Sequence, residues 1–442
     1  MKIITRTVWI LSMVSMLADM ASEMLYPVVP VYLQQIGFSV VYIGLLEGIA
    51  EVTVGMSKGY FGKQSDLRLQ RLPFIKTGYF LSALSKPMMA MFIYPLWIFF
   101  ARFTDRLGKG IRTAPRDALL SAEATPQTRG RIFGFHRSWD TVGAVIGPIF
   151  ALAYLHFFPG DYTRMFYLAF IPGLLSVACI FLLKEKRPSF RAQTNTEGAQ
   201  IKDARTENAQ IKDAQIKSEK FIGAQVEGEK TEGAQIKDPQ KFQGTKKKEG
   251  FFSYFSYWPK AGKPYRYTVT GLLLFAVANS SDVFLLLKAK EISGSDTITI
   301  SAYIFYNLVY ALTSYPLGKL ADRAGLKKVL VGGIVLFAMV YLGFAFNTSI
   351  WGLYALFLLY GIYAASTESV SKALISNLST REQMATSLGL FNSLQSLALF
   401  IASMMAGLLW AWKGDQVLFV VSAVLAIISA VFLGRKRMVS AH

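Results

Sequence analysis

The chain alternates between long apolar stretches and short polar connections that are mostly basic. An α-helix of about twenty apolar residues crosses a hydrocarbon core of roughly 30 Å. Even-period alternation, the mark of a membrane β-barrel, does not appear in the apolar stretches. The pattern therefore predicts an all-α membrane protein with twelve transmembrane helices, near residues 8–34, 40–62, 74–93, 96–119, 132–155, 164–183, 266–288, 298–317, 329–347, 350–372, 383–410 and 416–434.

One segment interrupts this pattern between the sixth and seventh apolar stretches. Residues 188–262 are polar, charged and poor in large apolar side chains, and part of them repeats the unit GAQIKD. Such a segment cannot bury enough apolar surface to order itself. We predict a disordered cytoplasmic linker there, between an N-terminal six-helix bundle (residues 1–187) and a C-terminal six-helix bundle (residues 263–442). A repeat that docks a partner is the alternative interpretation.

The composition agrees with a membrane protein, since 53% of the residues are hydrophobic and only 17% are charged. In a soluble chain the net charge of +19 would point to nucleic acid. In a membrane protein, however, Lys and Arg collect in the cytoplasmic loops, and here they concentrate in alternate connections. We therefore expect no nucleic-acid partner. We expect both termini in the cytoplasm and a multi-pass protein of the bacterial cytoplasmic (inner) membrane.

Residues that commonly hold metals are scarce in this chain. It has one cysteine, Cys179, and its three histidines, His136, His156 and His442, are scattered. The zinc motif H-E-x-x-H and the phosphate loop G-x-x-x-x-G-K-[ST] do not occur. We expect no metal site, no cofactor and no enzymatic activity, and the missing phosphate loop also argues against a pump driven by ATP.

The two halves of the chain resemble each other in sequence. GKQSDLR begins at residue 62 and GKLADRAGLKK at residue 318, each after the second apolar stretch of its half. FGFHRSWDTVGAVIG (133–147) aligns with LGLFNSLQSLALFIA (388–402), and both offsets are about 255 residues, which indicates the internal duplication seen in many transporters.

Three motifs at these places point to one known family. The loop after the second stretch reads roughly G-x-L-x-D-R-x-G-R-R in that family. The second half carries a close copy, Gly318, Asp322, Arg323, Gly325, Lys327 and Lys328. The first half carries a copy distorted by LQRLP, namely Gly62, Asp66, Arg68 and Arg71. R-x-x-x-G matches Arg106 and Gly110. G-x-x-x-G-P-x-x-G matches Gly143, Gly147 and Pro148, with Ala151 for the last glycine. Together these motifs resemble the major facilitator superfamily, over the whole chain except the linker.

This resemblance implies two pseudo-symmetric bundles around a central cavity that opens alternately to each side of the membrane. The motif at 143–151 is associated in the family with antiporters, mostly exporters. Simpler physical roles remain open for the same residues. Gly143 and Gly147 allow close helix packing, and Pro148 bends a helix. The Asp–Arg loops can pin helix ends, with a carboxylate against a helix N-terminus.

The fourth stretch is unusual because DRLGKGIRTAPRD (105–117) places charges inside a membrane helix. Projected at about 100° per residue, the charged residues from Arg102 to Asp117 fall within an arc of roughly 140°. A central charge facing lipid costs at least ~2.5 kcal/mol, so this face must meet water, partner charges or other helices. Candidate partners lie on the first, second, third and fifth stretches, and a sparser set lies in the second half.

Three roles follow from these positions as hypotheses. We expect ion coupling at Asp19, Glu23, Glu47, Glu51 and Asp140. We expect a substrate cavity at Tyr26, Lys86, Arg102, Arg106, Lys109, Arg137, Asn279, Asp282, Asn392 and Gln395. We expect a gate at Asp66, Arg68, Arg112, Arg116, Asp117, Asp322 and Arg323. The alternative is a salt-bridge network that locks the bundle and does not titrate during function.

The function predicted from the sequence is secondary active transport of a small organic solute by alternating access, through proton-coupled antiport (efflux). Uptake or exchange of an organic anion is the alternative, favoured by the cationic fourth stretch. A non-transporting membrane sensor built on a transporter scaffold is the alternative of a different class. The expected partners are the solute, protons and the lipid bilayer, and the chain is expected to act as a monomer.

Overall fold

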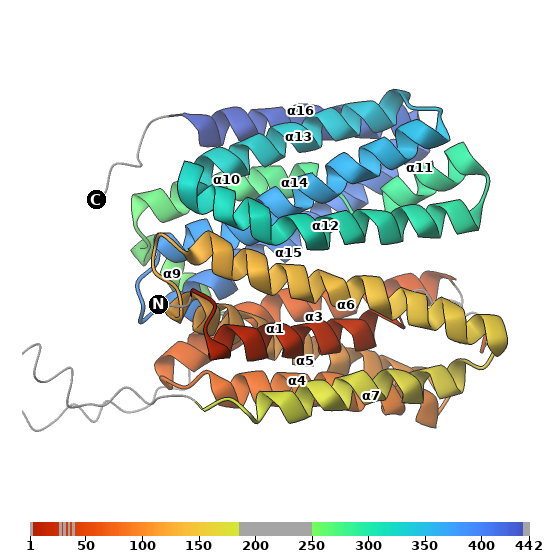
Figure 1. The fold of residues 1–442 in the computed structure, drawn as a ribbon, viewed down its shortest axis with the longest axis horizontal. Helices are drawn as coiled ribbons and strands as arrows, with labels where there is room; N and C mark the ends of the chain where they lie inside the picture. Colours follow the sequence, from red (N-terminus) through yellow and green to blue (C-terminus); the bar gives the residue numbers. More distant parts are fainter. Residues whose placement is uncertain are drawn as a thin grey trace, which may run out of the picture. The chain divides into compact units, whose positions relative to one another are not determined.

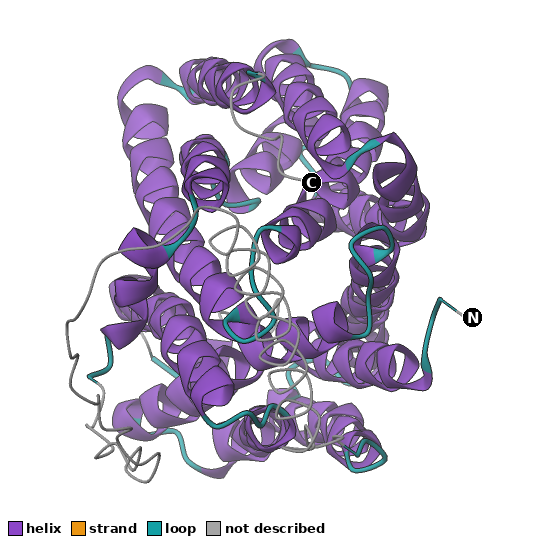
Figure 2. Cartoon of the chain, turned by 90° about the vertical axis from the view of Figure 1, so that its left-hand side faces the viewer, coloured by secondary structure: helices purple, strands orange, loops and turns teal. Residues whose placement is uncertain are grey.

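The computed structural model describes residues 3–25, 29, 32–33, 36–37, 40–184 and 250–435, without the side chains of residues 40–52 and 296–297. All regular elements of this described part are helices, as the sequence predicts (Figure 2). One compact unit joins Met1–Glu185 to Phe251–His442, so the two halves pack against each other. Tyr26, the side chains of Glu47 and Glu51, and the predicted linker up to residue 249 lie outside the described residues.

The first half contains six long helices at the places of the first six predicted spans (Figure 1). They are α1 (Arg6–Glu23), α3 (Val40–Leu67), α4 (Leu72–Met91), α5 (Pro95–Ala122), α6 (Arg129–Phe157) and α7 (Tyr162–Ile180).

The second half follows the same plan, with one difference in its first span. The sequence predicts one helix over residues 266–288, but the structure divides it at residues 279–282 into α10 (Lys263–Ala278) and α11 (Val283–Ser293). The polar run Asn279 to Asp282 interrupts the apolar stretch at this break. The other helices are α12 (Asp296–Ala324), α13 (Leu326–Phe346), α14 (Ile350–Asn377), α15 (Met384–Lys413) and α16 (Asp415–Gly434).

Helix packing repeats between the halves. In the first half α1 packs on α6 and α7, and in the second half α10 packs on α15 and α16. In the same way α4 packs on α5 and α7, while α13 packs on α14 and α16. The contact of α3 with α5 corresponds to that of α12 with α14. The duplication read from the sequence is therefore present in three dimensions.

Seven helical segments of the described part are long and apolar enough to cross a membrane by themselves. α5 is not one of them, because its polar face carries too many charges. That face is turned inward: Asp105, Arg112, Arg116 and Asp117 are all buried. Packing against the other helices thus takes the charges of α5 away from lipid, as the projection of the sequence requires.

The halves meet along two helix pairs, α3 with α15 and α6 with α12 (Figure 1). Glycines allow the backbones to come close. A Cβ on Gly130 would lie 2.5 Å from the Gly318 carbonyl oxygen, and a Cβ on Gly134 would lie 2.5 Å from that of Ser314. Larger residues at these places would force the two helices apart.

A short segment before α10 adds to the contact between α3 and α15. It contains the 3₁₀ turn η1 (Ser253–Ser256) and the helical turn α9 (Tyr257–Lys260). The Tyr254 ring is buried against Gly59 of α3, and Lys63 donates a hydrogen bond to the Ser253 carbonyl oxygen over 3.1 Å. The prediction of a disordered linker up to residue 262 is therefore wrong for these residues, because their aromatic side chains pack directly on the first half.

Candidate functional site

A cavity of about 320 Å³ lies between the halves. The first half contributes residues of α1, α3, α5 and α6, and the second half contributes residues of α12, α14 and α15. Its lining is strongly polar and consists of Asp19, Glu23, Lys58, Lys109, Arg112, Thr113, Arg116, Arg137, Asp140, Thr141, Ala144, Tyr303, Tyr306, Asn307, Tyr310, Glu368, Lys372, Asn392, Gln395, Ser396 and Leu399.

The charges of this lining are unevenly distributed. Among the described lining residues, six are basic (Lys58, Lys109, Arg112, Arg116, Arg137, Lys372) and four are acidic (Asp19, Glu23, Asp140, Glu368). The first half supplies eight of these ten charges, whereas the second half supplies tyrosines and amides as well as Glu368 and Lys372. The described part of the lining therefore has a cationic excess on one side and neutral hydrogen-bonding groups with aromatic rings on the other.

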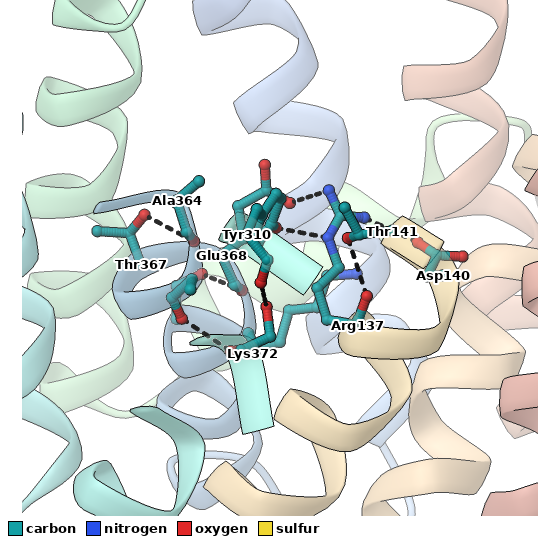
Figure 3. Close-up of polar contacts among 12 residues, drawn as sticks. Arg137, Asp140, Thr141, Tyr310, Ala364, Thr367, Glu368 and Lys372 are labelled. Carbon is teal, nitrogen blue, oxygen red and sulfur yellow. Dashed lines mark hydrogen bonds and ion pairs between the residues drawn. The ribbon is translucent and has the colours of Figure 1, made fainter. Parts of the chain in front are cut away.

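Arg137 of α6 connects the two halves at the cavity (Figure 3). Its guanidinium contacts Asp140 of its own helix over 2.8 Å and Glu368 of α14 over 2.7 Å. It also donates to the Tyr310 hydroxyl of α12 over 2.5 Å and lies over the same ring. Asp140 accepts a further hydrogen bond from the Ser15 hydroxyl over 2.6 Å. One arginine thus joins three helices from both halves.

A second charged bridge lies on α5. Asp117 is fully buried and pairs with its neighbour Arg116 over 3.0 Å and with Lys372 of α14 over 2.9 Å. The Arg116 guanidinium also donates to the Ser15 hydroxyl over 2.8 Å. Because its two cationic partners come from different halves, Asp117 ties the halves together.

Replacing Asp117 with asparagine is expected to destabilise the protein by about 3–5 kcal/mol, because it leaves the buried Arg116 and the partly buried Lys372 without their shared carboxylate. Thermal unfolding of the purified protein in detergent measures the loss. Asp161→Asn is the matched control, since its partner Arg164 is largely exposed and such surface pairs contribute about 0–1 kcal/mol. Equal unfolding temperatures for the two variants would contradict this expectation.

Asp19 and Glu23 lie one turn apart on α1, and both line the cavity. Unlike Asp140 and Asp117, neither carboxylate makes an ion pair with another described residue, and one buried oxygen of Glu23 has no hydrogen-bond partner there. Lys109 is a nearby cation for both carboxylates. These two acidic groups are therefore the cavity carboxylates that are not committed to a structural partner.

The sequence hypotheses for the cavity can be compared with this geometry. The structure brings Asp19, Glu23, Asp140, Lys109, Arg137, Asn392 and Gln395 together in the lining. Arg112 and Arg116, expected at the gate, also line it. Five expected cavity residues lie outside the lining: Lys86, Arg102, Arg106, Asn279 and Asp282.

Lys86 illustrates why a residue can be buried near the cavity without lining it. Its ammonium pairs with Asp105 of α5 over 2.8 Å and donates to the Ser22 hydroxyl over 3.3 Å. Arg112 of the same α5 face donates to the Ser82 hydroxyl over 2.5 Å and lies over the Tyr79 ring. The polar face of α5 is thus divided between the cavity and structural contacts with α4.

Sequence reasoning missed most of the aromatic side of the cavity. Tyr303, Asn307 and Tyr310 join Tyr306 along one face of α12. Their spacing of three or four residues was the available signal, because such residues share one face of a helix. Glu368 and Lys372, one turn apart on α14, belong to the sparser set that the sequence indicates in the second half, and both line the cavity.

The expected gate is built from two carboxylates, each placed against a helix N-terminus of the other half. Asp66 of α3 accepts from the backbone N–H groups of Ala385 (3.3 Å) and Thr386 (2.7 Å) at the start of α15. Asp322 of α12 accepts from those of Gly130 (2.8 Å) and Arg131 (3.0 Å) at the start of α6. Carboxylates satisfy the free N–H groups of a helix start and interact favourably with its dipole. We call the end of the bundle where these contacts lie the gate end.

The arginines at the gate end differ from those expected. Arg71 lies 3.8 Å from Asp66, and Arg131 lies 3.2 Å from Asp322. Arg68 and Arg323 are exposed beyond the interface, because their helices end there and point these side chains outward. Arg129 of α6 adds a contact across the halves, donating to the Asn377 side chain over 2.6 Å.

Burial raises the pKa of both gate carboxyls, which lie past the predicted ends of their spans. That of Asp66 rises to about 6, although hydrogen bonds from Thr386 and the charge of Arg71 oppose the rise. Burial raises the pKa of Asp322 for the same reason, and hydrogen bonds from the backbone of Arg131 and Gly130 and the charge of Arg131 oppose this rise. Each carboxyl therefore holds its proton more tightly with the gate end closed than when exposed to water.

This difference predicts a pH dependence of the gate end. Because the pKa of Asp66 in the closed arrangement exceeds its ordinary 3.8, protonation favours that arrangement. Its stability relative to the open arrangement is expected to rise by up to about 3 kcal/mol as pH falls from 7 toward 4. A cysteine placed at buried Ser393, in protein without Cys179, should react more slowly with a maleimide as pH falls. Rates are normalised to a cysteine at exposed Thr125. A pH dependence that is equally large in Asp66→Asn would contradict this assignment.

One short match to a catalytic motif has a structural explanation. Residues 55–59 read GMSKG, which fits the nucleophile pattern G-x-S-x-G. Ser57, however, lies in the middle of α3, is 2% exposed and packs against Gly110 of α5. The pattern requires an exposed serine on a sharp turn between a strand and a helix. The glycines here serve helix packing.

Two six-helix halves, joined at one end and enclosing a polar cavity, define a polytopic α-helical membrane protein of the transporter class. The family model described as Major Facilitator Superfamily matches residues 11–305 and 267–441 of the chain. The chain belongs to the Major Facilitator Superfamily.

Relatives in sequence agree with this assignment. An uncharacterized MFS-type transporter of Methanocaldococcus jannaschii is 30% identical over 436 residues, which cover 97% of this chain and 94% of that protein. The multidrug resistance protein MdtH of Proteus mirabilis is 29% identical over 136 residues, which cover 30% of this chain and 34% of MdtH.

Solved structures show the same fold. The human organic anion transporter MFSD10 aligns with a TM-score of 0.70 at 15% identity, covering 97% of this chain and 99% of that one. The proton:xylose symporter XylE aligns with a TM-score of 0.69 at 15% identity, covering 97% and 95%. These likenesses establish the fold, and the predicted all-α architecture of twelve spans in two bundles is confirmed.

Proposed function

We propose that this transporter moves a small organic solute by alternating access and couples the movement to protons, most simply as an antiporter that exports its solute. The supporting observation is the cavity between the halves, with Asp19 and Glu23 in its lining and a nearby cation, Lys109. A carboxylate near cations stays ionised, and it takes up a proton when a conformational change removes those cations. Protonation and conformation are thereby linked.

The distant likeness to MdtH, a multidrug resistance protein, supports the export direction. The glycines of the 143–151 motif are also explained by packing, since they bring the α6 backbone against α1 at Met16 and Met20. The motif therefore adds little to the case for export. Since both halves of one chain contribute the described lining, we propose that the monomer is the transporting unit.

A specific observation supports a second candidate, the transport of an organic anion. The described cavity lining has six basic and four acidic residues, so an anionic group would restore its charge balance. The tyrosines of α12 could hold an uncharged, ring-containing part of the same solute. MFSD10, which shares the fold, is an organic anion transporter.

One experiment separates these proposals. Candidate solutes are found by thermal shift on the purified protein, and their counterflow is then measured in liposomes at two pH values, with pH gradients of both directions. Antiport requires that an opposing proton gradient drives solute accumulation. Solute uptake driven by an inward proton gradient would indicate symport and overturn the export proposal. Ligand binding without flux would indicate a sensor.

A further inference from the structure

The break between α10 and α11 lies beside the cavity but outside its lining. The backbone N–H of Asn279 donates a hydrogen bond to the Phe275 carbonyl oxygen over 3.0 Å, which completes the last turn of α10. The backbone N–H of Ser281 instead donates to the Ser403 hydroxyl over 3.3 Å. The last carbonyls of a helix have no partner within it. Inside a membrane such irregular backbone is tolerated where it is buried in protein or lines a polar site.

Asp282 places a carboxylate at this break. Its two oxygens accept hydrogen bonds from the hydroxyls of Tyr360 (2.6 Å) and Tyr306 (2.9 Å). No basic residue among the described residues forms an ion pair with it. The charges that act on it from other helices are Glu368 and Arg137, and Arg137 is already engaged by Glu368 and Asp140.

Three further buried oxygens lie at or next to the break. The side-chain oxygens of Asn279 and Ser280 and the hydroxyl of Tyr341 make no hydrogen bond of full geometry with any described residue, although the Tyr341 hydroxyl comes near enough to those of Ser280 and Tyr360 for a weak one. Ser280 is 4% exposed and Tyr341 is fully buried. The Tyr341 hydroxyl lies beside the hydroxyls of Ser280 and Tyr360 and in the field of Asp282. Unsatisfied buried polar atoms are costly and call for an explanation.

The chemistry of this group is that of a hard cation site. Its candidate ligands are all oxygens: the Asp282 carboxylate, the Asn279 amide oxygen and the hydroxyls of Ser280 and Tyr341, next to the end of α10, where the last carbonyls lack partners within the helix. Nitrogen and sulfur ligands would suit transition metals, and divalent calcium or magnesium usually takes several carboxylates. One carboxylate balances one positive charge. Unwound backbone and half-helix ends of this kind coordinate sodium in other transporter folds.

We infer that the α10–α11 break, with Asp282, Asn279, Ser280 and Tyr341, is a binding site for a monovalent metal cation, sodium by its oxygen ligands. Because Tyr306 contacts Asp282 and also lines the cavity, a bound cation would fix one wall of the solute site. This site is separate from Asp19 and Glu23, so it does not depend on proton coupling.

The test uses the purified full chain in detergent, without solute and without a pH gradient. Thermal unfolding is followed in sodium, lithium, potassium and choline chloride at equal ionic strength. Sodium is expected to raise the unfolding temperature by several degrees over choline, in a saturable manner. Asp282→Asn should abolish this shift, and Glu291→Gln on α11 should retain it as the matched control. The same unfolding temperature in all four salts would overturn the inference.

A second pair of variants keeps the test informative if Asp282→Asn does not fold. Ser280→Ala and Tyr341→Phe each remove one unpartnered hydroxyl without changing charge. Each is expected to weaken the binding of radioactive sodium at least about tenfold, the effect of losing about 1.4 kcal/mol of binding free energy. Unchanged sodium affinity in both variants would show that these oxygens do not form the site. Failure here would leave the proton-coupling proposal intact, because that is measured as gradient-driven flux.

Discussion

Replacing Asp19 with asparagine, or Glu23 with glutamine, is expected to abolish solute flux driven by a pH gradient while the protein still inserts and folds. Amides keep the size of the side chains but cannot take up a proton. Both side chains line the cavity without an ion pair among the described residues, so their replacement leaves no buried cation without its partner. Flux in liposomes with an imposed pH gradient measures the loss, and solute counterflow should persist because it needs no net proton movement.

The control for this experiment is Asp161→Asn, which removes a carboxylate from the connection between α6 and α7. It should retain gradient-driven flux. Unchanged coupling in both the Asp19 and Glu23 variants would refute the assignment of these residues. Loss in only one of them would identify the carboxyl group that coupling requires, whereas loss in both would indicate that the two groups act as a coupled pair.

The geometry also separates these two residues from the other acids expected to couple ions. Asp140 is held by Arg137 and Ser15, and its removal would take one of the two carboxylates that bind the partly buried Arg137. These contacts stabilise the ionised carboxylate of Asp140, so they make it a structural partner of Arg137 and a poor proton carrier. Glu47 and Glu51 stay a prediction, because their side chains lie outside the described residues.

Much of the fold could be predicted because it follows from local sequence. Stretches long enough to cross a bilayer located the helices, and the charged arc of α5 predicted an inward polar face, which the burial of Arg112 and Asp117 confirms. The break in the seventh span was missed, since the apolar stretch around it is long enough for one helix. The polar run Asn279 to Asp282 was the signal that it contained.

The pairing of charges could not be predicted in the same way. Asp117 meets Lys372, and Arg137 meets Glu368, across more than two hundred residues of sequence. Such pairs depend on how two halves meet, and helix periodicity carries no information on that. The same limit explains the gate arginines: the motif contains Arg68 and Arg71, the gate hypothesis chose Arg68, and the turn after α3 brings Arg71 to Asp66.

Closure of the gate end should depend on the absence of a side chain at Gly134, where α6 crosses α12. A leucine there would place its Cβ 2.5 Å from the Ser314 carbonyl oxygen, which is backbone and cannot move aside without moving α12. Overpacking of this kind typically costs about 1–3 kcal/mol, and here the strain is relieved when the halves part. Gly134→Leu is therefore expected to shift the population toward the arrangement open at the gate end and to reduce flux about tenfold or more.

The opening can be measured at a place distant from the substitution. Ser393 of α15 is 1% exposed and donates a hydrogen bond to the Gly55 carbonyl of α3 over 2.6 Å, within the other contact between the halves. Since Cys179 is the chain's one cysteine, Cys179→Ala with Ser393→Cys gives a single reporter thiol. Gly134→Leu should speed its reaction with a maleimide because both interfaces part together. Gly332→Leu is the matched control, as a Cβ there meets nothing within 4 Å. Slow labelling and full flux in Gly134→Leu would mean that α6 and α12 do not separate during transport.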